Sequence, residues 1–172
     1  REIARRFNST YKNLLVEPDP MISEVSRLVG TDGQGKMSKS LNNSIYLSDT
    51  ESVVKKKVMK MFTDPNRTSA DIPGKVEGNP VFIYHDIFNQ NSAELDDFKD
   101  RYSKGKIGDV EVKDSLVKNI NNFLDPIRQK RSEILRNKSE ILDIIIEGSK
   151  RAREVTKKNL ELIKEAMSLN FK

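Results

Sequence analysis

Residues 30–43 read Gly30-Thr31-Asp32-Gly33-Gln34-Gly35-Lys36-Met37-Ser38-Lys39-Ser40-Leu41-Asn42-Asn43. The three glycines make this backbone flexible enough to approach a ligand closely. Two lysines follow them, with serine hydroxyls beside the lysines. A mobile backbone, positive charge and small hydrogen-bond donors together suit a polyphosphate ligand. Packing does not explain this combination, so the stretch is the first candidate for a functional site.

Two other interpretations of the stretch stay open on composition alone. A P-loop has the pattern G-x-x-x-x-G-K-[ST], which Gly30, Gly35 and Lys36 fit. Met37, however, stands where the P-loop needs a magnesium-binding hydroxyl. A P-loop must also be followed by a helix, and the residue types at 38–43 do not favour one. The second interpretation is a polar surface turn with two solvated lysines.

Composition excludes several classes of protein. The 172 residues carry a net charge of +5, which permits a polyanionic partner. There is no cysteine, so disulfides and thiolate metal sites are excluded, and we predict no metal site. No apolar run approaches the roughly 20 residues of a membrane span. A cytoplasmic protein is the expectation.

Outside the glycine-rich stretch, the pattern of apolar and capping residues predicts a mainly helical chain. The expected helices cover residues 2–12, 51–62, 80–88, 92–102, 109–135 and 139–169. Asn79, Asn91 and Asp109 are the expected caps of three of these helices, and a capping box at 48–51 is the expected start of another. Ser26 to Val29 is the one predicted buried strand. Seven apolar or small residues from Ile141 to Ala166 form a seam on the last helix, which predicts a helix bundle.

The letters of Lys36-Met37-Ser38-Lys39-Ser40 are the KMSKS signature of class I aminoacyl-tRNA synthetases in full. Further segments resemble the bacterial tryptophanyl-tRNA synthetases, namely residues 1–8, 30–34, 46–49, 61–66, 73–80, 108–110, 126–128 and 151–155. The resemblance therefore runs from the first residue to the last. It implies a mainly α fold, in which a helical anticodon-binding domain (49–172) follows the closing part of an α/β Rossmann-like catalytic domain (1–48).

The resemblance also implies a reaction and a set of site residues. The activity would be ATP-dependent activation of tryptophan to tryptophanyl-adenylate, with Mg²⁺ bound to the ATP, followed by transfer to tRNA(Trp). Lys36 and Lys39 would be catalytic, because their ammonium groups can meet the charge that develops on the leaving pyrophosphate. The ATP-binding residues would be Val25, Lys36, Met37, Ser38, Lys39 and Ser40. The complete enzyme would be a homodimer.

The HIGH-like motif and the tryptophan pocket of this family lie upstream of Arg1. We therefore expect this chain to be the C-terminal portion of a longer enzyme and to have no activation activity by itself. Because the residues that select the amino acid are missing here, a tyrosyl-tRNA synthetase fragment remains an alternative. A non-catalytic helical tRNA-binding module is the alternative from another class.

A basic cluster near the end of the long helix is the candidate for tRNA binding, and consists of Arg128, Lys130, Arg131, Arg136 and Lys138. Positive charge suits the phosphates, but reading bases also needs stacking and hydrogen bonds to base edges. The cluster has no aromatic residue, so the sequence leaves base reading unexplained. His85, the one histidine, has no cysteine or serine partner in the pattern and is assigned no site role.

Overall fold

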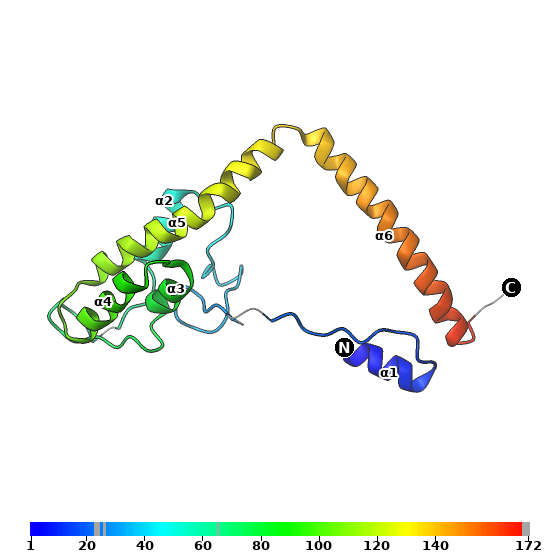
Figure 1. Ribbon diagram of the computed structural model, residues 1–172, viewed down its shortest axis with the longest axis horizontal. Coiled ribbons are helices and arrows are strands. Elements are labelled where there is room, and N and C mark those ends of the chain that lie inside the picture. The colour runs from blue at the N-terminus through cyan, green and yellow to red at the C-terminus, as the bar shows by residue number, and fades with distance from the viewer. Residues whose placement is uncertain (23–24, 26, 65, 170–172) are drawn as a thin grey trace. The chain divides into compact units, whose positions relative to one another are not determined.

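The computed structural model describes residues 1–22, 25, 27–64 and 66–169 (Figure 1). Within these ranges the helices are α1 (Glu2–Thr10), α2 (Glu51–Met59), α3 (Pro80–Phe88), α4 (Ser92–Ser103), α5 (Asp109–Ile134) and α6 (Lys138–Ala166). Contacts divide the chain into one unit of residues 1–22 and 133–172 and a second unit of residues 23–132. The predicted domain boundary between residues 48 and 49 stays a prediction.

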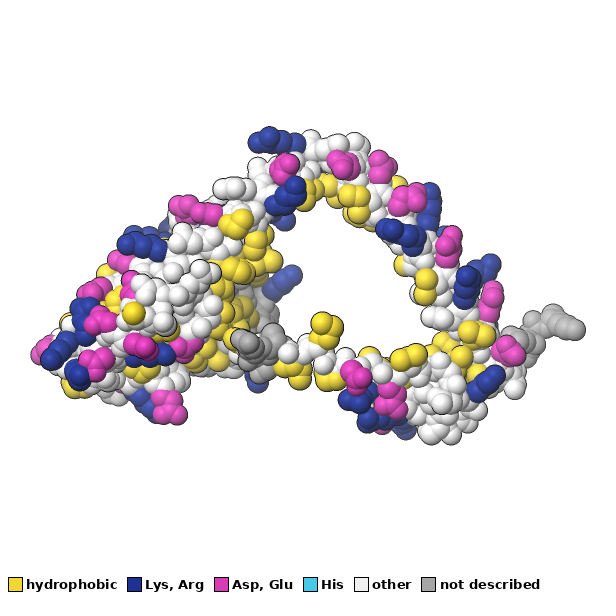
Figure 2. All heavy atoms as spheres, viewed as in Figure 1, with side chains coloured by type: hydrophobic (Ala, Val, Ile, Leu, Met, Phe, Trp, Pro, Cys, Tyr) yellow, Lys and Arg dark blue, Asp and Glu magenta, His cyan; other side chains and the backbone are white. Residues whose placement is uncertain are grey.

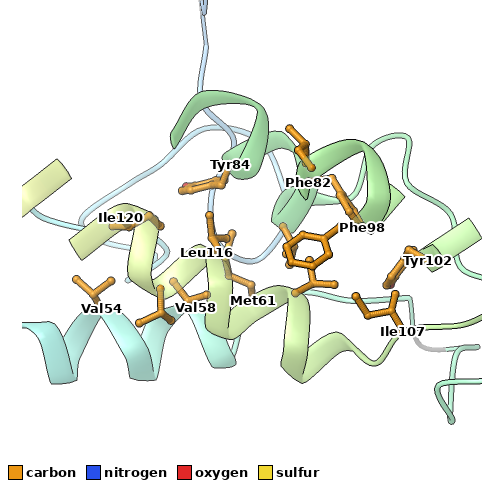
Figure 3. Close-up of a cluster of buried hydrophobic side chains, with 14 of the residues drawn as sticks. Val54, Val58, Met61, Phe82, Tyr84, Phe98, Tyr102, Ile107, Leu116 and Ile120 are labelled. Carbon is orange, nitrogen blue, oxygen red and sulfur yellow. The ribbon is translucent and has the colours of Figure 1, made fainter. Parts of the chain in front are cut away.

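The unit of residues 23–132 has a hydrophobic core contributed by four helices. Val54 and Val58 of α2, Leu116 of α5 and Phe98 of α4 all belong to one cluster of buried side chains (Figure 3). Burying each aliphatic or aromatic side chain of this kind stabilises the fold by about 1.5–3 kcal/mol. The core therefore joins segments more than fifty residues apart in the sequence into one body.

Asparagine side chains cap the N-termini of two of these helices, as the sequence predicts. Asn79 Oδ1 accepts a hydrogen bond from the Val81 N–H at 3.0 Å, and Asn91 Oδ1 accepts one from the Glu94 N–H at 3.2 Å. The predicted capping box before α2 is wrong. Helix α2 begins at Glu51 with Thr50 at the N-cap position, so Ser48 is not the capping residue. Thr50 makes no side-chain cap either, and its hydroxyl hydrogen-bonds the Ser52 hydroxyl.

Asp109 is the first residue of α5, but its carboxylate serves a different structure from the predicted cap. It binds the Arg67 guanidinium at 2.8 Å and accepts a hydrogen bond from the Tyr102 hydroxyl at 2.9 Å. Arg67 is 7% exposed, donates also to the carbonyls of Ala70, Ile72 and Ile107, and lies over the Tyr102 ring. This cluster ties the loop before α3 to the ends of α4 and α5. Burial, together with Asp109, raises the pKa of Tyr102 to about 12.

The apolar seam predicted for the last helix is present, but no described residue of α6 is buried. Ile145 and Val155, two residues of the seam, are both more than half exposed. Figure 2 shows charged side chains along one edge of α6 and hydrophobic ones along the other. The prediction that this seam forms the inside of a bundle is therefore wrong for the chain as described, because a seam is buried only where a partner surface meets it.

The predicted buried strand also differs from the structure. Ser26 lies outside the described residues, and Arg27 and Leu28 have no regular structure. Val29 makes only an isolated antiparallel bridge to Lys36. A longer strand needs a neighbouring strand to pair with, and the described chain supplies none. The mainly α fold is confirmed by the six described helices. Among them, none is long and apolar enough to span a membrane.

His85 is a core residue with both ring nitrogens in use. Nε2 lies 2.9 Å from the Val112 carbonyl oxygen, which can only accept, so Nε2 carries the proton. Nδ1 then accepts from the Asn89 amide nitrogen at 3.3 Å. Asn89 is held in this orientation, since its amide nitrogen also donates to Glu94 and its oxygen accepts from the Asn91 N–H. Burial is the main cause that lowers the pKa of His85 below 6.5.

This geometry predicts that stability falls in mild acid. Above pH 6.5 the ring is neutral in the folded and unfolded chain, so its contribution is complete. Below pH 6.5 the unfolded chain takes up a proton that the folded chain excludes, and the free energy of unfolding falls until the lower folded pKa is reached. Urea denaturation of wild type and His85→Gln at pH 8 and pH 5.5 checks this. The difference between the two proteins should shrink at the lower pH, and a constant difference would contradict the prediction.

Candidate functional site

The glycine-rich stretch forms a closed loop. The bridge between Val29 and Lys36 joins its two ends, and the Gly30 N–H donates to the Gly35 carbonyl at 3.1 Å. Inside the loop, the Gly33 N–H donates to the Gly30 carbonyl at 2.9 Å. Gly33 and Gly35 have φ values of +74° and +56°, which residues with a Cβ rarely adopt. Two of the three glycines are therefore required by the backbone conformation.

Asn43 is the buried polar centre of this loop, with 2% of its surface exposed. Its Oδ1 accepts a hydrogen bond from the Ser38 N–H at 2.7 Å. Its Nδ2 donates to both carboxylate oxygens of Asp32, at 3.1 and 3.0 Å, and to the Lys36 carbonyl at 3.4 Å. One amide thus holds the glycine segment and the lysine segment together. Gly30 lies against it, since a Cβ there would be 2.3 Å from Asn43 Nδ2.

The base of the loop is attached to the helical core. The Tyr84 hydroxyl of α3 donates to the Val29 carbonyl at 2.7 Å, and the Phe62 N–H donates to the Thr31 carbonyl at 3.0 Å. Burial, with a smaller contribution from the Asp32 charge, raises the pKa of Tyr84, so the hydroxyl stays a donor. Beside this attachment lies an apolar cavity of about 210 Å³, lined by Leu28, Met37, Ile45, Leu47, Tyr84, Phe88, Ile120, Phe123 and Leu124.

The two lysines of the motif lie at the solvent side of the loop. Lys36 and Lys39 are exposed, and neither side chain forms an ion pair with another described residue. The Ser38 and Ser40 hydroxyls hydrogen-bond each other at 2.8 Å. Met37 is partly buried against the core. The structure thus brings the predicted residues 36–40 together, with free cations outside and an anchored backbone beneath.

Val25, the remaining predicted ATP-binding residue, is described without its immediate neighbours, since residues 24 and 26 lie outside the described ranges. Its side chain is 41% exposed. The predicted contacts of Val25 and of residues 36–40 with ATP stay predictions.

The basic cluster predicted to bind tRNA is divided in the structure. Arg128 donates to the Asp49 carbonyl, Asp125 Oδ1 and Asn121 Oδ1, each at 2.7 Å, so its guanidinium fastens α5 to the turn before α2. Arg131, Arg136 and Lys138 are exposed. The boundary between the two compact units falls after Ser132, within the cluster. Contact of this cluster, Lys130 included, with tRNA stays a prediction.

Two residues that organise the loop were given no role from the sequence. Asn43 lies three residues after Ser40, the last residue of the motif, and its only signal in the sequence is the Asn42-Asn43 pair. Asn42 has the left-handed φ of 53°. Tyr84 is one of several apolar or aromatic residues in α3, and no local pattern marks its hydroxyl as a partner of Val29. The role of Tyr84 depends on a contact across the fold, and the role of Asn43 depends on how the loop closes around its side chain.

Comparisons with known proteins identify the class of protein to which this fold and loop belong. Residues 1–125 match the family described as tRNA synthetases class I (W and Y). The chain belongs to this family.

Two relatives within this family, both tryptophan–tRNA ligases, are similar over nearly the whole of this chain. The tryptophan–tRNA ligase of Treponema pallidum is 50% identical over 170 residues, which cover 99% of this chain and 50% of that protein. The tryptophan–tRNA ligase of Borreliella burgdorferi is 50% identical over 172 residues, with 99% and 49% covered. The chain spans about half the length of these relatives.

A solved structure agrees with the sequence comparison. The tryptophanyl-tRNA synthetase of Campylobacter jejuni, solved with ADP and tryptophan, matches with a TM-score of 0.72 and 29% identity. The match covers 98% of this chain and 52% of that one. The resemblance to tryptophanyl-tRNA synthetases is therefore confirmed, as is the fold class.

The geometry predicts that Asn43→Ala loosens the loop. Without the amide, the Ser38 N–H and the Asp32 carboxylate lose their buried partner, a loss of about 1–3 kcal/mol. Trypsin, which cuts after lysine, should then cleave after Lys36 and Lys39 several-fold faster under native conditions. Gln34→Ala is the matched control, since the Gln34 side chain is exposed and only its backbone N–H is hydrogen-bonded. Equal cleavage rates for the two variants would show that Asn43 does not hold the loop.

Proposed function

We propose that this chain is the C-terminal portion of a tryptophan–tRNA ligase. The complete enzyme forms tryptophanyl-adenylate from tryptophan and Mg-ATP and then transfers the tryptophanyl group to tRNA(Trp). The single observation that carries the proposal is a complete KMSKS loop, anchored by Asn43, in a chain that is 50% identical over nearly its whole length to a tryptophan–tRNA ligase.

Lys36 and Lys39 are the proposed catalytic groups. In the activation step, the carboxylate of tryptophan attacks the α-phosphate of ATP, a new C–O–P linkage forms, and the bond to pyrophosphate breaks. Negative charge grows on the leaving oxygens during this step. Two ammonium groups with no carboxylate partner among the described residues can meet that charge in the transition state, where the interaction lowers the barrier.

The other residues of the loop have proposed supporting roles. Ser38 and Ser40 exchange their mutual hydrogen bond for phosphate oxygens when ATP binds. The Met37 backbone and Val25 lie by the adenine, as the family resemblance implies. Gly33 and Gly35 allow the tip of the loop to close over ATP and open for release, while Tyr84 and Asn43 keep its base in place.

The helical residues 49–172 are the proposed tRNA-binding part. Arg131, Arg136 and Lys138 are exposed and available for phosphates, and Lys130 and Arg128 belong to the same basic cluster. Assembly of the complete enzyme as a homodimer and its location in the cytoplasm belong to this proposal and rest on the family resemblance.

The test is tryptophan-dependent exchange between ATP and labelled pyrophosphate, using the full-length protein. Exchange with tryptophan and not with tyrosine is the expected result, and the reverse would identify a tyrosine enzyme. Residues 1–172 alone should give no exchange, because the residues proposed to hold tryptophan are not among them. Absence of exchange with either amino acid, together with retained tRNA binding, would favour the non-catalytic tRNA-binding module.

Lys39→Ala in the full-length protein should lower the rate constant of activation about 100-fold, the usual cost of losing one group that meets transition-state charge. The KM for tryptophan should change less than threefold, because the ground state does not use this lysine. Steady-state exchange measures both quantities. Lys56→Ala on α2 is the matched control, since Lys56 is exposed and forms no ion pair with a described residue. Equal losses in rate and tryptophan affinity would argue against a transition-state role.

A further inference from the structure

Lys113 is a buried lysine of α5 whose ammonium group binds the end of α2. Only 6% of its surface is exposed. Its Nζ donates to the Met61 carbonyl at 2.8 Å and to the Met59 carbonyl at 3.2 Å. Helix α2 ends at Met59, so both carbonyls lie where a helix leaves acceptors unpaired. Lys113 therefore joins the end of α2 to a helix 52 residues later in the chain.

A lysine is an expensive choice for this buried position. Burying an ammonium group costs free energy unless hydrogen bonds and charge compensate it. Asp109, one turn earlier on α5, is bound to Arg67. Burial lowers the pKa of Lys113, and the Asp109 charge only opposes that change. An apolar side chain of similar length would avoid the cost, so the two carbonyl partners explain the lysine better than packing does.

One of these carbonyls belongs to a peptide group that also contacts the lysine loop (residues 30–43). The Met61 carbonyl and the Phe62 N–H are parts of one planar peptide unit, so they turn together. The carbonyl accepts from Lys113, and the N–H donates to the Thr31 carbonyl at 3.0 Å. A cation at the carbonyl also polarises the peptide and strengthens its N–H as a donor. Lys113 therefore fixes the direction from which this peptide holds the loop.

Short links connect Thr31 to the segment that carries the motif lysines. The Thr31 N–H donates to the Asn43 carbonyl at 2.9 Å. The Asn43 side chain accepts from the Ser38 N–H at 2.7 Å, and Ser38 lies between the two lysines in the sequence. The Phe62 ring adds a second contact, since a Cβ on Gly33 would lie 3.2 Å from it. The turn after α2 is thus connected to the backbone beneath the cations.

We propose that Lys113 is a positioning residue for the activation reaction. It holds the Met61–Phe62 peptide so that Lys36 and Lys39 stay aligned with the leaving pyrophosphate. Lys113 acts through the loop and has no proposed contact with a substrate. The inference rests on the proposed function, which supplies the reaction. Misplacing a catalytic group by about 1 Å can cost about 100-fold in rate, so losing one support of the loop is measurable.

The test is a mutant cycle in the full-length protein, followed by tryptophan-dependent pyrophosphate exchange. Lys113→Met keeps the apolar stem and removes the ammonium group. It should lower the rate constant of activation about tenfold and change the KM for tryptophan less than about twofold. In a Lys39→Ala background the same substitution should cost less than about threefold, because one of the lysines that it positions is already missing. A general loss of stability would instead lower the rate by the same factor in both backgrounds.

Lys55→Met is the matched control. Lys55 also joins α2 to α5, through an ion pair with Asp114 at 3.8 Å, but it is exposed and lies on the surface. This variant should exchange pyrophosphate at the wild-type rate. Lys113→Gln is the second variant and decides the question if Lys113→Met does not fold. It keeps a neutral donor, so it should lower the rate only about threefold with the KM for tryptophan unchanged.

Amide hydrogen exchange gives a readout that needs no reaction. Lys113→Met, or Lys113→Gln in its place, should speed exchange of the Phe62 N–H about fivefold, while the Val54 N–H within α2 exchanges as in wild type. If the wild-type protein lacks tryptophan-dependent pyrophosphate exchange, the proposed function fails, whatever the Phe62 amide does. If wild type is active and the folded Lys113 variants match its rate, or lose the same factor in both backgrounds, Lys113 does not position the loop.

Discussion

The lysine loop depends on the side chain of one buried asparagine. Asn43 is the right residue for this place because an amide can donate and accept at once, while the groups around it need both. The Ser38 N–H requires an acceptor, and the Asp32 carboxylate and Lys36 carbonyl require a donor. Glycine-rich backbone loses much conformational entropy when it is ordered. A single satisfied buried amide offsets part of that loss and leaves the lysine side chains outside free to move.

The attachment of the loop to the helices explains how a mobile tip and a fixed base coexist. Tyr84 on α3 holds the Val29 carbonyl, and Met37 and Leu28 pack at the edge of the helical core. These contacts are all at the foot of the loop, and neither lysine side chain forms an ion pair with a described residue. Under the proposed function, this arrangement confines closure over ATP to the segment that carries the cations. The helical part therefore contributes to the proposed activation site by supporting the loop, as well as by its proposed contact with tRNA.

The helical unit uses some of its basic side chains for the fold itself. Arg128 resembles a phosphate ligand in the sequence, yet its guanidinium is used by Asp49, Asn121 and Asp125. Arg67, which no pattern marked, is buried and carries the connection between α4 and α5. The Gln90 and Asn122 side chains, in contrast, are exposed and hydrogen-bond no other described residue. The neighbours of a polar side chain thus determine whether it stabilises the fold or is available to a ligand.

The sequence by itself determined the helices, the Asn79 and Asn91 caps and the lysine motif, because these depend on residues within a few positions of each other. The local pattern was misleading before α2, where a capping box was expected and Thr50 hydrogen-bonds Ser52 instead. The sequence also did not predict that Asp109 binds Arg67 or that Arg128 binds the Asp49 carbonyl, since both contacts join residues far apart in the chain. The α6 seam was predicted from its spacing, but spacing cannot say whether a partner surface covers it. Only the tertiary structure decided that Asn43 and Tyr84 hold the loop. Side-chain hydrogen bonds and burial depend on which residues are close in space, and local sequence does not predict that proximity.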